Sequence, residues 1–98
     1  MGRYVLAPEA LQDLHDIWEF IALDNPDAAS TLQEELFTAF EGLATMPGKG
    51  HKREDLTDQA VRFFKVRSYL IVYRADRTPI QIVAVLHAAR DIPSLLMR

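Results

Sequence analysis

An α+β domain is the fold class that this sequence predicts, because helix-like and strand-like patterns occupy separate parts of the chain. Two segments with a 3.6-residue apolar period come first, and three short runs rich in β-branched and aromatic residues follow. A short strand at the start completes the order β-α-α-β-β-β, in which a helical hairpin covers one face of a small, mainly antiparallel sheet. A chain of 98 residues with 49% hydrophobic content is expected to form a single domain, 1–98.

The two helices are predicted from their apolar stripes and from the breaks that bound them. The segment Tyr4-Val5-Leu6 is the first strand, and Pro8 then suits the first turn of a helix over about 9 to 23. The stripe of this helix is Ala10, Leu11, Leu14, Ile17, Trp18 and Ile21. After the break at 24–26, a second stripe ends before 46–48 and comprises Ala29, Leu32, Leu36, Ala39, Phe40 and Leu43. So close a break favours an antiparallel hairpin, with Trp18 and both stripes facing the sheet.

The strands follow an exposed basic loop at 47–60, which is rich in glycine and charge. Three strands are expected near 61–66, 69–75 and 80–88. The chain then reaches Asp91, a possible N-cap followed by a proline near the first turn, so a short C-terminal helix is expected.

The charge changes sign along the chain. Residues 1–48 hold one basic and nine acidic residues, a net of −8, whereas residues 49–98 hold ten basic and five acidic residues, a net of +5. A basic half predicts a local anionic partner, which nucleic acid, ribosome or an acidic protein segment could each supply. The lack of cysteine excludes disulfides and cysteine zinc sites, and His15 and His51 have no spacing typical of metal ligands. We expect a soluble cytoplasmic protein without metal, cofactor or membrane span.

Taken together, the segments resemble the ParE/RelE superfamily of toxins from type II toxin–antitoxin modules, and within it the ParE or plasmid-stabilisation branch. Each segment alone is a weak signal, but their order and spacing are specific. They cover almost the whole chain and are Leu6-Ala7-Pro8-Glu9-Ala10, Asp13-Leu14, Ile17-Trp18-Glu19-Phe20-Ile21, Asn25-Pro26, Ala28-Ala29, Met46-Pro47-Gly48, Gly50, Arg67-Ser68-Tyr69-Leu70-Ile71-Val72-Tyr73-Arg74, and Val85-Leu86-His87-Ala88-Ala89-Arg90-Asp91.

The resemblance implies a toxin that a cognate, ParD-like antitoxin binds and neutralises. Proteins similar to ParE poison DNA gyrase, whereas proteins similar to RelE cut mRNA in the ribosome. In such modules DNA binding belongs to the antitoxin, so no sequence-specific DNA binding by this chain is expected. Our first hypothesis is a gyrase inhibitor that works by protein–protein interaction; a third possibility is a relative that has lost toxicity but still binds antitoxin.

The second hypothesis, a ribosome-dependent endoribonuclease, needs proton-transfer groups and cations that stabilise a charged phosphate. RelE-like members use lysines, arginines and a C-terminal Tyr or His. This chain has no Tyr after Tyr73, which leaves His87 as the proton-transfer candidate, with Arg67 and Arg90 as phosphate contacts. The alternative for His87 is a structural residue that donates a hydrogen bond at the strand end. Under the first hypothesis the chain has no catalytic residue.

Four arginines form the predicted basic face for target or antitoxin: Arg62, Arg67, Arg74 and Arg90. Planar, permanently charged side chains suit phosphate or carboxylate recognition. The alternative is that some of them pair with Asp76 or Asp91 and only hold the sheet in register. Lys49, Lys52 and Arg53 are interpreted as a solvated loop.

Phe20 and Phe37 lie off the centres of their helical stripes, by roughly 100° or more. If exposed, the two rings mark a hydrophobic groove for an antitoxin segment. The alternative is that they pack on each other or lie under the loop at 47–60.

Overall fold

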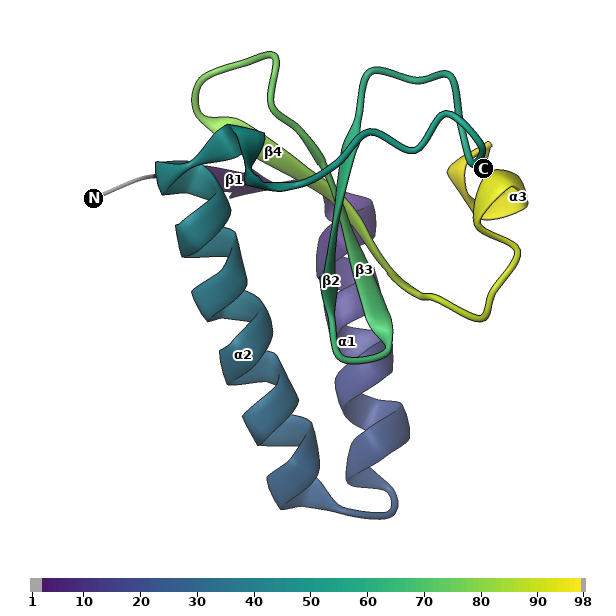
Figure 1. Cartoon of the computed structure of the whole chain (residues 1–98). Helices are drawn as coiled ribbons and strands as arrows, with labels where there is room; N and C mark the ends of the chain where they lie inside the picture. Colours follow the sequence, from purple (N-terminus) through teal and green to yellow (C-terminus); the bar gives the residue numbers. More distant parts are fainter. Residues whose placement is uncertain (1–2, 98) are drawn as a thin grey trace.

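The computed structural model describes residues 3–97 and has the predicted α+β architecture (Figure 1). The elements, in chain order, are β1 (Tyr4–Leu6), α1 (Pro8–Ala22), α2 (Pro26–Thr45), the short 3-10 helix η1 (Pro47–Lys49), β2 (Arg62–Val66), β3 (Tyr69–Arg74), β4 (Ile80–His87) and α3 (Ile92–Leu96). The predicted fold class, including the β-α-α-β-β-β order and the short C-terminal helix, is confirmed.

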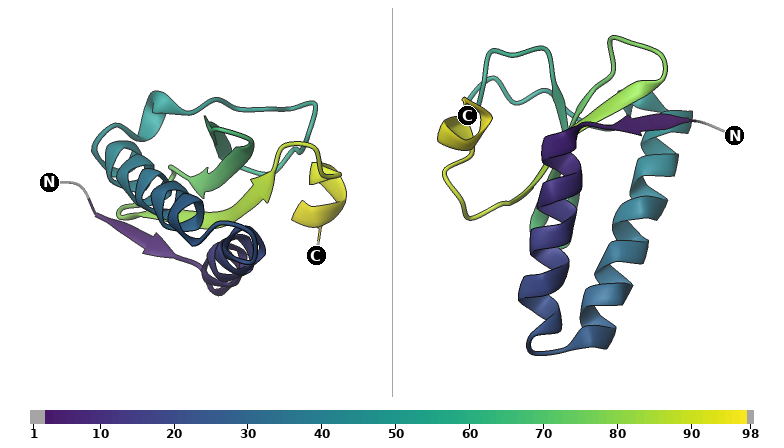
Figure 2. Two further views of the ribbon diagram at one scale, coloured as in Figure 1. Left: turned by 90° about the horizontal axis from the view of Figure 1, so that it is seen from below. Right: turned by 180° about the vertical axis from the view of Figure 1, so that it is seen from behind.

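Local chemistry explains where the two long helices begin. Each starts with a proline at its first or second position, where the missing N–H removes no helical hydrogen bond. Asn25 caps α2, because its side-chain oxygen accepts a hydrogen bond from the Ala28 N–H at 3.1 Å. The helices are antiparallel and lie side by side in all views (Figures 1 and 2).

The sheet has the strand order β1-β4-β3-β2. β3 pairs antiparallel with both β2 and β4, whereas β1 pairs parallel with β4, and only over Ile80–Ile82. An irregularity between Val72 and Tyr73 shifts the register of β3 on β4. The sheet is therefore mainly antiparallel, and β4 extends well past the end of its neighbour β1.

The two faces of the sheet are covered differently. Under α1 and α2 lies the larger cluster of buried side chains, which includes Leu36, Phe40, Ile71 and Ile82. A smaller cluster on the other face joins Phe63, Leu70, Val72 and Leu86 to Ile92 of α3. The helical layer thus supplies most of the burial, and α3 with the loop at 51–61 covers only part of the second face (Figure 2).

Trp18 corrects one expectation about the α1 stripe. Its side chain is 36% exposed, and it borders a narrow space between α1 and α2 with Ala29 and Gln33. Periodicity placed Trp18 in the core facing the sheet, but this side of α1 turns toward α2 and toward solvent. The prediction of a core position for Trp18 was wrong.

Candidate functional site

The structure does not bring the four predicted arginines into one cluster. Arg62 and Arg74 lie at the end of β2 and β3 where Arg62 pairs with Tyr73. Arg67, in the turn between these strands, and Arg90, beyond the end of β4, lie at the opposite end, where Tyr69 pairs with His87. We call the first the closed end and the second the open end of the sheet.

At the closed end both arginines have partners inside the protein. Arg62 donates a hydrogen bond from Nη1 to the Gly50 carbonyl at 2.9 Å. Arg74 donates from Nη2 and Nε to the two carboxylate oxygens of Asp76 at 2.8 and 3.2 Å. These hydrogen bonds are the main reason that the pKa of Asp76 is lowered. The alternative role foreseen for Arg74, pairing with Asp76, is the arrangement found.

Two hydrogen bonds of the Tyr73 hydroxyl connect the loop after α2 to the closed end. Its side chain is fully buried; the hydroxyl donates to the Pro47 carbonyl at 2.7 Å and accepts from the Gly50 N–H at 2.8 Å. Burial raises the pKa of this phenol. A Cβ atom on Gly50 would lie 2.4 Å from the Tyr73 hydroxyl oxygen and 2.9 Å from the Phe63 carbonyl oxygen, so only glycine fits there.

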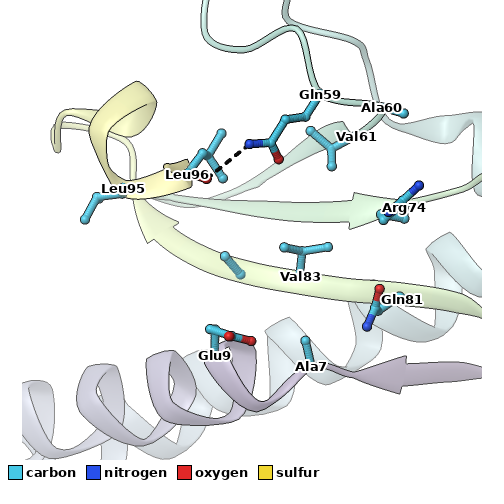
Figure 3. A pocket seen from close by; sticks show the side chains of 11 residues that line it. Ala7, Glu9, Gln59, Ala60, Val61, Arg74, Gln81, Val83, Leu95 and Leu96 are labelled. Carbon is cyan, nitrogen blue, oxygen red and sulfur yellow. Dashed lines mark hydrogen bonds between the residues drawn. The ribbon is translucent and has the colours of Figure 1, made fainter. Parts of the chain in front are cut away.

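Arg74 also borders a hollow on the face of the sheet away from the long helices (Figure 3). This hollow has a volume of about 550 Å³ and extends from Glu9 of α1 to Leu95 and Leu96 of α3. Gln59 closes one side, since its side-chain amide donates to the Leu96 carbonyl at 3.1 Å. Among the lining residues within 3–97, Arg74 is the one cation, and it is paired with Asp76.

Arg67 at the open end is tied to the helical layer. Its guanidinium donates two hydrogen bonds to the Glu35 carboxylate of α2, from Nε at 2.5 Å and Nη2 at 2.7 Å, and these lower the pKa of Glu35. Arg67 has a φ of 53°, a left-handed conformation that is uncommon outside glycine and asparagine. The ion pair therefore holds a strained turn residue against the neighbouring helix.

Arg90 is different, because within residues 3–97 its side chain makes no hydrogen bond or ion pair. It lines a cleft of about 310 Å³ on the face opposite the long helices, together with Arg53 and Lys65. Arg53 is paired with Asp55 at 2.8 Å, whereas no acidic partner of Lys65 is found in the described part of the chain. We call the cleft of Arg53, Lys65 and Arg90 the basic cleft; it is suited to carboxylates or phosphates.

Arg90 also lines a second cavity, which we call the edge groove. It has a volume of about 480 Å³ and lies between α1 and the last residues of β4. Its lining residues are Asp13, Asp16, Ile17, Phe20, Tyr69, Val85, Leu86, His87, Arg90 and Leu95. Phe20 is 67% exposed, so its ring presents apolar surface beside the groove. One arginine therefore joins a charged cleft to a largely apolar groove.

His87 lines the edge groove, and its ring lies nearly perpendicular to that of Tyr69, with the planes at 80° and the ring centroids 5.2 Å apart. Its Nδ1 accepts a hydrogen bond from the Ala89 N–H at 3.0 Å. The structural role foreseen for His87 was that of a donor, and here it accepts. An accepting Nδ1 carries no proton, so the neutral ring has its proton on Nε2.

Phe37 has different surroundings from Phe20. It is half-buried and packs edge-on against Phe40, with the ring centroids 5.6 Å apart and the planes at 84°. Phe37 thus belongs to the core under the helices, whereas Phe20 lines the edge groove. Neither of the foreseen alternatives, mutual packing of the two rings or burial under the loop, describes both residues.

Two features of the site had no signal in the sequence. The Asp13 carboxylate accepts a hydrogen bond from the Val85 N–H at 3.0 Å, across 72 positions of the chain. Lys65 and Arg53 line the same cleft as Arg90 only because the loop and β2 fold beside the start of α3.

No group of three metal-binding side chains lies together within residues 3–97, and none of the helices described there is long and apolar enough to cross a membrane.

Comparison with known protein families identifies the family of this chain. The family described as the ParE toxin of the type II toxin–antitoxin system parDE matches residues 4–92, nearly the entire chain. The chain belongs to the ParE toxin family. This result confirms the resemblance to the ParE branch that the sequence segments indicated.

One relative agrees with this assignment, and one solved structure agrees with the fold. A protein of Sinorhizobium fredii (strain NBRC 101917 / NGR234) named "Putative toxin Y4kP" is 31% identical over 87 residues, which span 89% of this chain and 88% of the relative. A solved structure described as the chromosomal ParDE TA system from P. aeruginosa matches with a TM-score of 0.72, covering 89% of this chain and 96% of that one. Its sequence identity is 19%, so it supports the fold alone.

Proposed function

We propose that this ParE-family toxin acts in the cytoplasm by binding DNA gyrase, without catalysis of its own, and that a ParD-like antitoxin neutralises it. The observation that carries the proposal is Arg90, a cation with no intramolecular partner within residues 3–97, at the junction of the basic cleft and the edge groove. An arginine beside exposed aromatic surface is typical of protein–protein recognition sites. Family membership supports the same conclusion.

Antitoxin binding would use the same open end. Carboxylates of the antitoxin would form charge-assisted hydrogen bonds with Arg90 and Lys65, and an apolar side chain would cover Phe20. Arg67 and Arg74 would first have to leave Glu35 and Asp76, so we assign them a smaller part in binding. Arg62 is likewise engaged, by the Gly50 carbonyl. An antitoxin seated here would keep gyrase from the surface.

A second candidate function is RelE-like cleavage of mRNA in the ribosome. One observation favours it: His87 and Arg90 line the same groove, so a proton-transfer group and a phosphate-binding group lie on one surface. Arg67, the third residue of that hypothesis, is held by Glu35 and would need to turn away from it to reach a phosphate.

The test compares both activities with the same purified, antitoxin-free protein. One assay measures gyrase supercoiling and DNA cleavage, and the other measures cleavage of a labelled mRNA on translating ribosomes. Inhibited supercoiling with accumulated cleaved DNA and intact mRNA is the expected result. Cut mRNA with unaffected gyrase would replace the proposal by the nuclease function.

The variant His87→Ala separates the two mechanisms in cells. Under gyrase inhibition without catalysis, toxicity should fall by less than about tenfold, because one exposed contact is removed. Under ribonuclease chemistry, loss of the acid–base group should reduce activity by roughly 100-fold or more. If the unaltered protein does not slow growth when expressed alone, the third possibility, a non-toxic antitoxin-binding protein, takes precedence.

A further inference from the structure

The turn between β2 and β3 holds a cation where hairpin turns usually have a small residue. Val66 pairs with Tyr69, so the hairpin loop consists of two residues, Arg67 and Ser68. Loops of this length favour a positive φ, and glycine, asparagine or aspartate usually supplies it. Here Arg67 has the left-handed conformation, with a φ of 53°. A long charged side chain therefore stands at a position that strains its backbone.

The ion pair with Glu35 does not explain why an arginine stands in this turn. Both partners are exposed, with 63% of the Arg67 side chain and 37% of the Glu35 side chain accessible to solvent. Exposed ion pairs contribute little to folding, and the left-handed conformation costs a residue with a Cβ atom at least as much. Glycine would adopt the same φ without that cost. Arginine at this position thus gives the fold no advantage in stability, which points to a role in binding.

Glu35 occupies the Arg67 guanidinium in the way that an external carboxylate would. Its two oxygens accept hydrogen bonds from Nε at 2.5 Å and from Nη2 at 2.7 Å, as in other bidentate pairs of arginine and carboxylate. The two residues come from separate elements, 32 positions apart in the chain, so neither turn geometry nor helix spacing forces them together. Glu35 therefore acts as an internal ligand of Arg67.

The exposure of this pair means that it can open at low cost. Water replaces the hydrogen bonds of both side chains when they separate, and the Glu35 carboxylate can turn into solvent from the surface of α2. While the pair is closed, its two charges largely cancel, so an approaching anion is only weakly attracted to the guanidinium. An external anion therefore has to replace Glu35 in order to bind Arg67 fully.

The two arginines of the open end thus differ in their availability. The Arg90 side chain has no internal partner within residues 3–97, whereas Glu35 occupies Arg67. Arginines are frequent anchors of protein–protein interfaces, and the planar guanidinium fits the two oxygens of a carboxylate. The contact with Glu35 shows that the Arg67 guanidinium accommodates a carboxylate in its present backbone conformation. The external ligand that fits Arg67 is therefore an Asp or Glu side chain.

We propose that Glu35 is an autoinhibitory ligand of Arg67, and that the carboxylate of an acidic side chain of the target protein displaces it. The incoming carboxylate accepts hydrogen bonds from the same Nε and Nη2 groups, and Glu35 turns into solvent. The assignment of the target as gyrase rests on the proposed function. The exchange of carboxylates follows from the strained turn, the exposed pair and the position of Arg67 at the open end.

The first test measures the affinity of purified, antitoxin-free toxin for gyrase and compares Glu35→Gln with the unaltered protein. Glutamine keeps the shape of the side chain but removes its charge, so affinity should rise by about three- to fivefold. Glu34→Gln is the matched control, since it removes the same charge from α2 at the neighbouring position. An equal rise for both variants, or no rise for Glu35→Gln, would overturn the exchange. A fall for Glu35→Gln would make Glu35 a positioning residue and would also overturn it.

The second test uses Arg67→Gly, which removes the guanidinium and relieves the turn. Its affinity for gyrase should fall by about fivefold to tenfold, while the midpoint of thermal unfolding should stay within about 3 °C. A purely structural arginine would give the reverse, a lower midpoint with unchanged affinity. The double variant Glu35→Gln/Arg67→Gly should bind like Arg67→Gly alone, because Glu35 acts only through Arg67. A rise in affinity from Glu35→Gln that persists without Arg67 would contradict the proposal.

A titration without gyrase separates this proposal from the proposed function. The probe is a hexaglutamate peptide, and the NMR signal of the Arg67 Nε–H reports its binding. Affinity should again be about three- to fivefold higher for Glu35→Gln than for the unaltered toxin. If the toxin binds no gyrase, the proposed function fails, and this titration alone decides whether the exchange occurs. A single-stranded hexanucleotide that shifts the signal where the peptide does not would identify phosphate as the ligand and overturn the assignment to an acidic side chain.

Discussion

The closed and open ends of the sheet carry similar side chains but differ in how many of them bond within the protein. At the closed end, Arg62, Tyr73 and Arg74 all bond to groups of the protein itself. At the open end, Arg67 is paired with Glu35, but the Arg90 side chain bonds to nothing within residues 3–97, and Phe20 is largely exposed. The closed end therefore holds the fold together, whereas the open end retains groups for a partner.

The comparison also shows why an arginine's sequence position does not reveal its role. Arg74 and Arg90 each stand near the end of a strand and each precede an aspartate by one or two positions. Asp76 turns back to pair with Arg74, whereas Asp91 accepts a hydrogen bond from Ser94 in the first turn of α3. The neighbouring acid, rather than the arginine itself, determines which cation is available for binding.

The largest effect is expected from Gly50→Ala at the closed end. Its new Cβ would lie 2.4 Å from the Tyr73 hydroxyl oxygen, so the loop must move and its hydrogen bonds break. We expect the free energy of unfolding to fall by about 2–4 kcal/mol, measured by urea denaturation. Gly48→Ala is the matched control, since nothing lies within 4 Å of a Cβ there. Similar losses for both would contradict this account of the closed end.

The next prediction separates the two phenylalanines. Phe37→Ala should lower the free energy of unfolding by about 1–3 kcal/mol, because it removes the packing on Phe40. Phe20→Ala should change it by less than about 0.5 kcal/mol, since the ring is mostly exposed. In a binding titration, only Phe20→Ala should weaken the antitoxin complex without weakening the fold. Equal stability losses for the two variants would remove the distinction between core and groove.

A smaller, pH-dependent effect is expected from Tyr73→Phe. Loss of the bonds to Pro47 and Gly50 should lower the free energy of unfolding by about 1–2 kcal/mol at neutral pH. Because burial raises the pKa of Tyr73 in the folded protein, its stabilising contribution is full below the unfolded pKa of 10.0 and decreases as pH rises above it. The difference between the two proteins should therefore narrow in alkaline urea titrations. A difference that widened would show the opposite sign of coupling.

The smallest effects on folding are expected from the arginines themselves. Arg74→Gln removes an exposed ion pair and should cost less than about 1 kcal/mol, and Arg90→Gln should cost nothing measurable. For antitoxin binding, the order of the two variants should be the opposite, with the larger effect from Arg90→Gln. Antitoxin affinity should drop by about tenfold for Arg90→Gln, because a charge-assisted hydrogen bond is lost, and should not change for Arg74→Gln. Equal losses of affinity would mean that the closed end also binds antitoxin.

Most of the fold could be predicted because local patterns determine it. The stripe and caps of α2 depend on residues within one or two turns, and Pro26 and Asn25 mark its start in the sequence itself. The strands β2 to β4 were recognisable from their β-branched and aromatic content. Trp18 was misplaced because periodicity identifies the apolar side of a helix but not whether it faces the sheet or the neighbouring helix.

The site was less predictable because it depends on contacts between distant residues. Arg67 pairs with Glu35 across 32 positions, and Asp13 reaches Val85 across 72. No spacing rule relates such pairs, since the topology alone brings them together. His87 ends β4 and Arg90 follows it closely in the chain, but the groove that they share follows from the course of α1. Their functional roles remain predictions.

The separation of charge along the chain has a consequence for encounters with large polyanions such as DNA or RNA. With a net charge of −3, the protein would be expected to be repelled by them. Its dimensions, 37 × 33 × 21 Å, exceed the Debye length of about 8 Å in physiological salt, so a polyanion senses only the nearest part of the surface. Electrostatic torque should turn the acidic helical hairpin away from the polyanion and the basic residues of the sheet toward it. The orientation of the protein, and not its net charge, then governs its approach to the polyanion.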